Sequence, residues 1–262
     1  MGKKDTALKI TVLLSYIVMV IITVISFVVK INGRTVMETI ASYPNLFAPS
    51  RYAFFVLSLS NILLLAFSIY QLGIFKKKHN NEKEILHDSR IACLTINVLN
   101  ISWLIAWHYD YLALSVLILF GIVMTLRVYG LLLKNETLTF KEKVLLGLPF
   151  NLLFAWTTLL AVTNTFILLD SLRWEGFGFS KTMWVIVVMI LITLLAVKQI
   201  LHNKNLVYGI TFLWVYVAIL VRQVSKSELH SEYPFIILTT ICGIIILIGA
   251  NGALLVKSMK KE

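Results

Sequence analysis

Amide and indole side chains recur at helical spacing inside apolar stretches of this chain. The clearest set follows steps of 3, 3 and 4 residues, on one face of a helix: Asn97, Asn100, Trp103 and Trp107. Such groups could bind the polar edge of a small molecule and stack on its flat apolar body. The simpler interpretation is hydrogen bonding between helices, worth roughly 0.6 kcal/mol per contact in a membrane. We favour the simpler interpretation for any single asparagine and a polar, aromatic pocket for the whole set.

Two other stretches carry polar side chains on one helical face. Asn151, Thr158 and Thr165 form a narrow stripe within residues 148–169, a stretch of 22 residues without charge. Asn61 lies on a similar face between two serines, within an earlier apolar stretch. Because lipid offers no hydrogen bonds to an amide, we expect these faces to meet protein or a cavity.

The chain shows no pattern typical of catalysis or metal binding. His108 and Asp110 come nearest to an acid–base pair, but a turn or helix cap at a tight corner is the simpler role. No Asp or Glu falls in the middle of an apolar stretch, where ion-coupled transporters usually place one. Cys93 and Cys242 lie in separate apolar runs, without disulfide or metal-ligand spacing. We therefore expect no enzyme, no metal and no cofactor.

The composition indicates a polytopic membrane protein of the all-α class, a bundle of transmembrane helices. The chain has 262 residues, of which 59% are hydrophobic and 14% charged, against about 25% charged in a soluble domain. The net charge of +11 comes from lysines and arginines near the ends of apolar runs. That distribution follows the positive-inside rule and gives no single basic face, so we exclude nucleic acid as a partner.

Eight apolar stretches are expected to be transmembrane helices. They lie at 10–29, 52–72, 91–107, 111–133, 148–169, 182–201, 206–221 and 234–256. A helix of ~20 residues, at ~1.5 Å per residue, crosses a hydrocarbon core ~30 Å thick. The basic segment 76–90 is expected to be a loop. The polar segment 30–51 is long enough to fold over one end of the bundle.

The positive charges predict the orientation of the chain in the membrane. An even number of spans places both termini on the same side. With the N-terminus inside, 17 of the 24 lysines and arginines fall inside and 7 outside. Because basic residues concentrate on the cytoplasmic side, we predict a multi-pass cell-membrane protein with both termini in the cytoplasm.

Three segments, taken together and in order, resemble the TspO/MBR family of tryptophan-rich sensory proteins, which are related to the translocator protein. They are NLFAPSRYAFFVLSLSNILLLAFSIYQ at 45–71, LNISWLIAWHYD at 99–110 and LPFNLLFAWTTLLAVTN at 148–164. These are similar to the second, third and fifth helices of that family. The resemblance covers roughly residues 8–170. The family's second-helix tryptophan and tyrosine correspond here to Leu57 and Asn61.

The resemblance implies a five-helix bundle that binds tetrapyrroles, sterols or other hydrophobic ligands, with roles in sensing or transport. The ligand-binding residues carried over by position, with Asn61 added, are Tyr52, Phe54, Asn61, Asn100, Trp103, Trp107, Trp156, Ala161 and Asn164. We expect a pocket that opens toward the outer surface beneath segment 30–51. In domain terms, we expect residues 1–172 to form the TspO-like five-helix bundle and residues 173–262 to add three transmembrane helices packed on it.

Three functions are compatible with these observations. The first is a regulatory membrane protein that binds a hydrophobic ligand without turnover. The second is a small transporter for lipophilic or tetrapyrrole cargo, and the weakest is a membrane-embedded enzyme. The absence of acids within the spans favours the first over an ion-coupled transporter. The expected partners are membrane lipid, a hydrophobic small molecule and a second copy of the chain, since Gly249 and Ala253 offer a small-xxx-small face for a homodimer.

Overall fold

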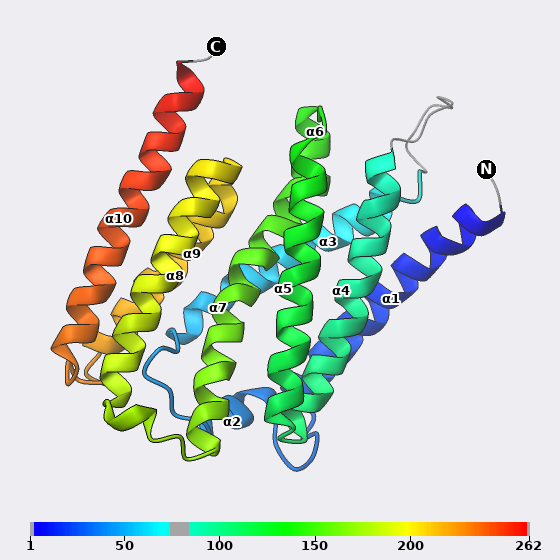
Figure 1. Ribbon diagram of the computed structural model, residues 1–262. Helices are drawn as coiled ribbons and strands as arrows, with labels where there is room; N and C mark the ends of the chain where they lie inside the picture. Colours follow the sequence, from blue (N-terminus) through cyan, green and yellow to red (C-terminus); the bar gives the residue numbers. More distant parts are fainter. Residues whose placement is uncertain (1–2, 74–83, 261–262) are drawn as a thin grey trace. The chain divides into compact units, whose positions relative to one another are not determined.

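The computed structural model describes residues 3–73 and 84–260, and within them eight helices are long and apolar enough to cross a membrane (Figure 1). They are α1 (Lys3–Val28), α3 (Phe55–Tyr70), α4 (Glu84–His108), α5 (Leu112–Lys134), α7 (Leu148–Ser171), α8 (Lys181–Asn203), α9 (Leu206–Val224) and α10 (Pro234–Met259). The short 3-10 helix η1 (Arg51–Phe54) leads into α3 and completes the second span, Arg51–Tyr70, and the π-helical turn η2 (Lys143–Gly147) leads into α7. The remaining short helices are α2 (Val36–Ala41), α6 (Phe140–Glu142) and η3 (Gly176–Gly178). The predicted all-α membrane class and its eight spans are confirmed.

The start of the third span corrects one expectation. Helix α4 begins at Glu84, whereas the sequence predicts a loop through Arg90. Arg90 is 1% exposed and fits inside the helical bundle because Asp5 and Gln71 bind its guanidinium group. A basic residue therefore continues this helix where the sequence suggests a break. Residues 76–83 of the predicted loop lie outside the described residues.

Contacts divide the chain into two compact units. The first contains Met1–Pro44 and Leu57–Leu168, and the second contains Asn45–Val56 and Leu169–Glu262. Segment 45–56 thus belongs with the last three long helices, although it lies between α1 and α3 in the sequence. The expected domain division into 1–172 and 173–262 stays a prediction.

In the first unit, α4 packs between α1 and α5. Tyr16 of α1 joins α3 by donating its hydroxyl hydrogen to the carbonyl oxygen of Asn61, at 2.8 Å. Phe150 of α7 packs against Tyr129 of α5 and Phe67 of α3, with ring centroids 4.6 and 5.4 Å apart. Aromatic and polar contacts therefore connect α7 and α3 to the α1–α4–α5 group.

Helix α7 is the most enclosed of the spans. Of the apolar 18-residue stretch in the span that contains α7, Phe140–Ser171, 56% is buried, against 22 to 50% in the other spans. The threonine stripe on this helix bonds within its own backbone. The hydroxyl of Thr158 donates to the carbonyl of Phe154 at 2.7 Å, and that of Thr165 donates to Ala161 at 2.8 Å. Because these hydroxyls have partners in their own helix, they need neither a ligand nor another helix.

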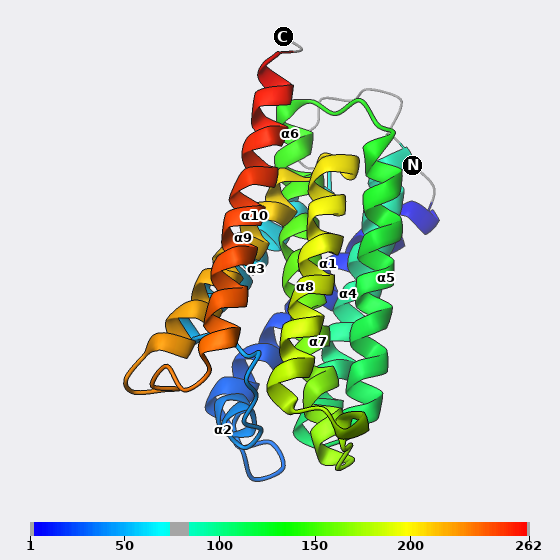
Figure 2. The ribbon, with the colours of Figure 1, turned by 60° about the vertical axis from the view of Figure 1, so that its left-hand side comes forward.

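The second unit is built on α8, α9 and α10, which pack against one another (Figure 2). Close approach depends on two buried glycines, since a Cβ atom added to Gly209 would collide with Asn251, and one added to Gly243 with Tyr216. Gly249, by contrast, is exposed, and an added Cβ would meet nothing within 4 Å. The predicted Gly249–Ala253 face is therefore open within the chain, and self-association through it stays a prediction.

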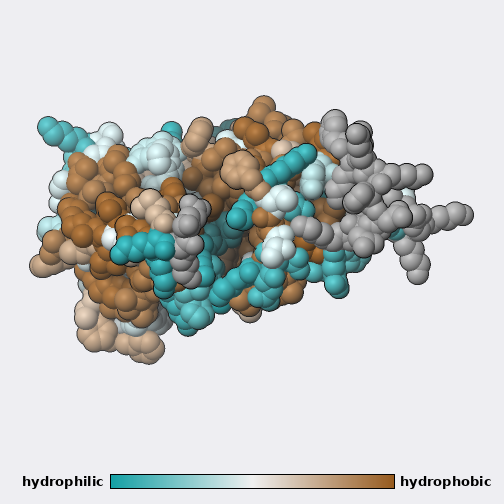
Figure 3. Space-filling view, turned by 90° about the horizontal axis from the view of Figure 1, so that it is seen from above, coloured by the Kyte–Doolittle hydropathy of each residue, from teal (hydrophilic) through white to brown (hydrophobic). Residues whose placement is uncertain are grey.

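The surface chemistry agrees with helices that cross a membrane. In the end-on view of Figure 3, hydrophobic side chains make up much of the edge of the visible face, and hydrophilic ones lie on the end that faces the viewer. Isoleucine and leucine side chains such as Ile62 of α3, Leu117 of α5 and Leu195 of α8 are exposed along the spans. Lipid is the environment in which such surfaces are stable.

Candidate ligand-binding site

The short helix α2 lies within segment 30–51, and two reciprocal hydrogen bonds between Thr35 and Glu38 cap its first turn. The backbone N–H of Thr35 donates to the carboxylate of Glu38 at 2.7 Å, and the N–H of Glu38 donates to the Thr35 hydroxyl at 3.3 Å. This reciprocal pair is a capping box. The hydrogen bond from the Thr35 backbone also lowers the pKa of the Glu38 carboxyl. Local sequence thus specifies α2 in a segment that is otherwise polar.

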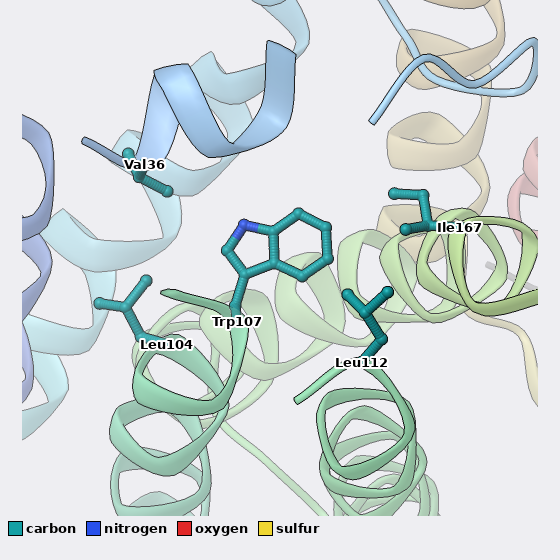
Figure 4. Close-up of a cluster of buried hydrophobic side chains, with 5 residues drawn as sticks. All are labelled: Val36, Leu104, Trp107, Leu112 and Ile167. Atoms are coloured by element: carbon teal, nitrogen blue, oxygen red, sulfur yellow. The ribbon is translucent and has the colours of Figure 1, made fainter. Parts of the chain in front are cut away.

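Helix α2 covers one end of the first unit through a buried hydrophobic cluster (Figure 4). The buried members come from α2, α4, α5 and α7: Val36, Leu104, Trp107, Leu112 and Ile167. Trp107 lies at the centre of this cluster and is 3% exposed. Met37, Ile40 and Tyr43 pack against the same cluster. The apolar side of α2 and Tyr43 therefore cover the cluster. We call α2 with its flanking residues the α2 cap (residues 32–43).

Polar contacts attach the α2 cap to the corner between α4 and α5. Asp110 pairs with Arg34 and accepts a hydrogen bond from the Tyr43 hydroxyl at 2.6 Å. Asn32 donates its side-chain N–H to the carbonyl of His108 at 3.0 Å. Burial and the bond to Asp110 together raise the pKa of Tyr43 to about 12. The corner that the sequence analysis treats as a turn is thus also the attachment point of the cap.

Two of the predicted site residues meet directly beneath this cap. The rings of Trp103 and Trp107 stack with centroids 6.3 Å apart and planes at 20°, and Tyr43 lies 5.3 Å from Trp107. The indole nitrogen of Trp103 is buried and has no hydrogen-bond partner among the described residues. Buried indole N–H groups usually have a hydrogen-bond partner. Because this one has none among the described residues, it could donate to an acceptor atom of a bound molecule.

The predicted site residues on α7 are buried. Trp156 and Ala161 are enclosed, and the side-chain N–H of Asn164 donates to the carbonyl of Leu160 at 3.0 Å. The Asn164 side-chain oxygen accepts a hydrogen bond from Ser115 of α5 at 3.3 Å. Asn164 therefore makes the interhelical contact of the simpler interpretation.

The other predicted residues lie in different surroundings. Asn61 donates its side-chain N–H to the carbonyl of Leu57 in its own helix, at 3.0 Å, and Asn100 is half-buried. Tyr52 and Phe54 belong to the second unit, where the Tyr52 ring meets Trp214 edge-on at 5.4 Å. The structure thus brings Trp103 and Trp107 together. A ligand-binding role for all nine residues stays a prediction.

The sequence of this chain matches a known protein family over most of its length. A family model described as TSPO-like protein matches residues 9–252. The chain belongs to the TSPO-like protein family. No curated protein and no solved structure gave a match. The family match extends well past residue 170, where the sequence resemblance was expected to end, and reaches into α10. The last three long helices of this TSPO-like protein are therefore part of what the family model describes.

This TSPO-like chain also contains a buried ionic network that the sequence does not predict. Arg90 of α4 donates from Nη1 to Asp5 at 2.8 Å and from Nη2 to the carbonyl of Gln71 at 3.0 Å. Gln71 in turn donates to the carbonyl of Lys9 at 2.8 Å, and Lys9 pairs with Asp5 at 3.1 Å. The one local signal was the Asp5–Lys9 spacing of i, i+4 on α1. The network connects α1, the end of α3 and α4.

The described residues of the TSPO-like chain contain no cluster of three or more His, Cys, Asp or Glu side chains that could hold a metal ion. Cys93 is buried and Cys242 is exposed, so the two cysteines have different surroundings. The described chemistry beneath the α2 cap is an aromatic pair and an indole donor.

Proposed function

We propose that this TSPO-like membrane protein binds a flat hydrophobic ligand, such as a tetrapyrrole or a sterol, beside Trp103 and Trp107 and acts in regulation without turnover. The observation that supports this proposal is the buried Trp103 N–H that has no partner in the described residues. A donor in this position loses hydrogen-bonding energy unless an acceptor reaches it. A carbonyl, carboxylate or hydroxyl oxygen of a ligand would supply that acceptor.

The surroundings of the two indoles support the same class of ligand. Trp107 contributes an apolar surface within the cluster, and Trp103 stacks on it with a nearly parallel ring. Met37, Ile40 and Tyr43 of the α2 cap pack against the same cluster. A ligand that enters here would have to displace part of the cap. Ligand binding would then change how α2 is held, which is a signal suited to a regulatory protein.

A titration tests this function. Purified protein in detergent is titrated with a panel of tetrapyrroles and sterols, and binding is followed by quenching of tryptophan fluorescence. Trp103→Phe keeps an aromatic ring and removes the N–H donor. Since a hydrogen bond contributes about 0.5–1.5 kcal/mol, this variant should bind roughly 2- to 10-fold more weakly.

The matched control is Trp174→Phe, which changes a tryptophan of the second unit and should leave affinity unchanged. Equal affinity of the wild type, Trp103→Phe and Trp103→Ala would contradict the proposed site. Movement of a bound tetrapyrrole or sterol across the membrane of sealed vesicles would instead assign the alternative function, a small transporter.

A further inference from the structure

The segment between α7 and α8 is rich in aromatic residues, and we call residues 172–180 the aromatic loop. Trp174 contacts both Trp184 of α8 and Phe177, with ring centroids 5.0 and 5.6 Å apart. The Trp184 indole N–H donates to the carbonyl of Gly176 at 2.9 Å. These contacts give the loop a defined conformation that is anchored on the first turn of α8.

The backbone of the aromatic loop is held in a conformation that most residues avoid. Gly176 has a φ of +64°, and a Cβ atom there would lie 2.9 Å from the indole nitrogen of Trp184. Phe177 also has a positive φ, of 53°. A bulky residue in the left-handed region is strained, and such strain concentrates at functional positions. The Phe177 side chain is 80% exposed in this conformation.

Three large apolar side chains of the loop face away from the protein. Leu172 is 67% exposed and Phe179 is 54% exposed, in addition to Phe177. Segment 225–232, which joins α9 to α10, instead has the polar sequence SKSELHSE. The exposure of apolar side chains in the aromatic loop is thus not a general property of the connections in the second unit.

The aromatic loop lies between two membrane spans, and this position indicates which environment its exposed apolar side chains meet. The loop joins the end of one membrane span, at Ser171, to the start of the next, at Lys181, so it lies at the membrane boundary. The exposed apolar surface continues onto α8 through Met183, which is 46% exposed. Tryptophan is enriched at the boundary between lipid and water, where its ring is apolar and its N–H polar. We propose that the aromatic loop inserts Leu172, Phe177 and Phe179 into the headgroup layer of the membrane.

Site-directed spin labelling of the full chain in phosphatidylcholine bilayers tests the insertion. Cys93→Ala and Cys242→Ala remove the native thiols, and Phe177→Cys provides the labelling site. The control label is Ser227→Cys, in the polar segment between α9 and α10. The label at 177 should be several-fold more accessible to oxygen than to a water-soluble nickel chelate, and the label at 227 should show the opposite preference.

Two outcomes would overturn the proposal. A label at 177 that the nickel chelate reaches as readily as at 227 would place the loop in water. A label that neither reagent reaches would show that protein covers the loop. If the cysteine-free background does not fold, Phe177→Trp with both cysteines intact gives the same reading. Its added fluorescence should be quenched by brominated lipid, and quenching by aqueous iodide alone would contradict insertion.

Discussion

Asp110 has more structural influence than a residue at a turn usually has. It adopts a positive φ of 58°, which Asp tolerates better than most residues, and its carboxylate binds both Arg34 and Tyr43. Both partners belong to the α2 cap, 67 and 76 residues earlier in the chain. One side chain therefore supplies two of the polar contacts that attach the cap at this corner, beside the bond from Asn32 to His108.

Replacing Asp110 should loosen the α2 cap. Asp110→Ala removes the ion pair with Arg34 and the acceptor for Tyr43, and the loss should be about 1 kcal/mol because both partners are partly exposed to water. Hydrogen exchange at the α2 amides should accelerate by up to about 5-fold. Asp170→Ala, which breaks an ion pair with Lys181 in the second unit, is the control and should leave α2 exchange unchanged.

Attachment of the cap should also depend on pH through Tyr43. Its pKa rises from 10.0 to about 12, so the folded cap favours the protonated phenol. This contribution is fully present below about pH 10 and is lost as the pH rises through about 12. Protection of the α2 amides, measured as hydrogen exchange relative to the rate of an unstructured peptide at the same pH, should therefore fall in this window in the wild type. Tyr43→Phe should remove that fall in protection, and an identical fall in the variant would refute the assignment.

At the scale of elements, Arg90 connects three helices. Its guanidinium group binds Asp5 on α1 and both the side chain and backbone of Gln71 at the end of α3. Asp5 keeps its ion pair with Lys9 when Arg90 is removed, but the two Gln71 acceptors lose their donor inside the protein. Because a buried acceptor without a partner costs about 1–3 kcal/mol, Arg90→Leu should lower the free energy of unfolding in detergent by roughly that amount.

Arg90→Lys should recover only part of that stability, since one ammonium group cannot reproduce the planar arrangement of donors. Lys198→Ala, at an exposed position of α8, serves as the neutral control. If Arg90→Lys had the same free energy of unfolding as the wild type, a positive charge alone would be sufficient at position 90, and the planar arrangement of donors would not be required.

Substitutions at two glycines of α9 and α10 should have different effects on stability, because only one of these glycines is tightly packed. Gly209→Ala places a methyl group against Asn251 and Ile200, and overpacking of this kind typically costs 1–3 kcal/mol. Gly249→Ala should be neutral or slightly stabilising, since its surroundings are open and alanine favours helices. Thermal unfolding of both variants in detergent measures the difference. Equal melting temperatures would contradict the close α9–α10 contact.

At the scale of the whole molecule, eight spans and the distribution of basic residues predict the orientation in the membrane. A reporter fused after Glu262 should read as cytoplasmic, and one inserted after Ser227 should read as extracytoplasmic. The physical reason is the excess of lysine and arginine in the segments assigned to the inside. A reporter at Glu262 that is active only outside the cell would exclude this topology.

The sequence by itself determined the membrane class, the eight spans and the helical face that carries Trp103 and Trp107. Apolar length and residue spacing are local properties, so they can be read without knowing which segments meet. These features do not depend on contacts between distant parts of the chain. Helix α2 is not among the predicted elements, because segment 30–51 is expected only as a polar covering segment, although Thr35 and Glu38 form a capping box within one turn.

Only the tertiary structure showed which polar side chains are hydrogen-bond or ion-pair partners of one another. Nothing in the sequence indicated that Asp110 would bind Tyr43, or that Arg90 would be buried within a helix instead of lying in a loop. The threonine stripe of α7 suggested a polar surface, yet its hydroxyls bond to their own backbone. A polar side chain can be satisfied by its own helix, by a neighbour or by a ligand. Because these alternatives have the same local sequence, only the distances in the folded chain distinguish them.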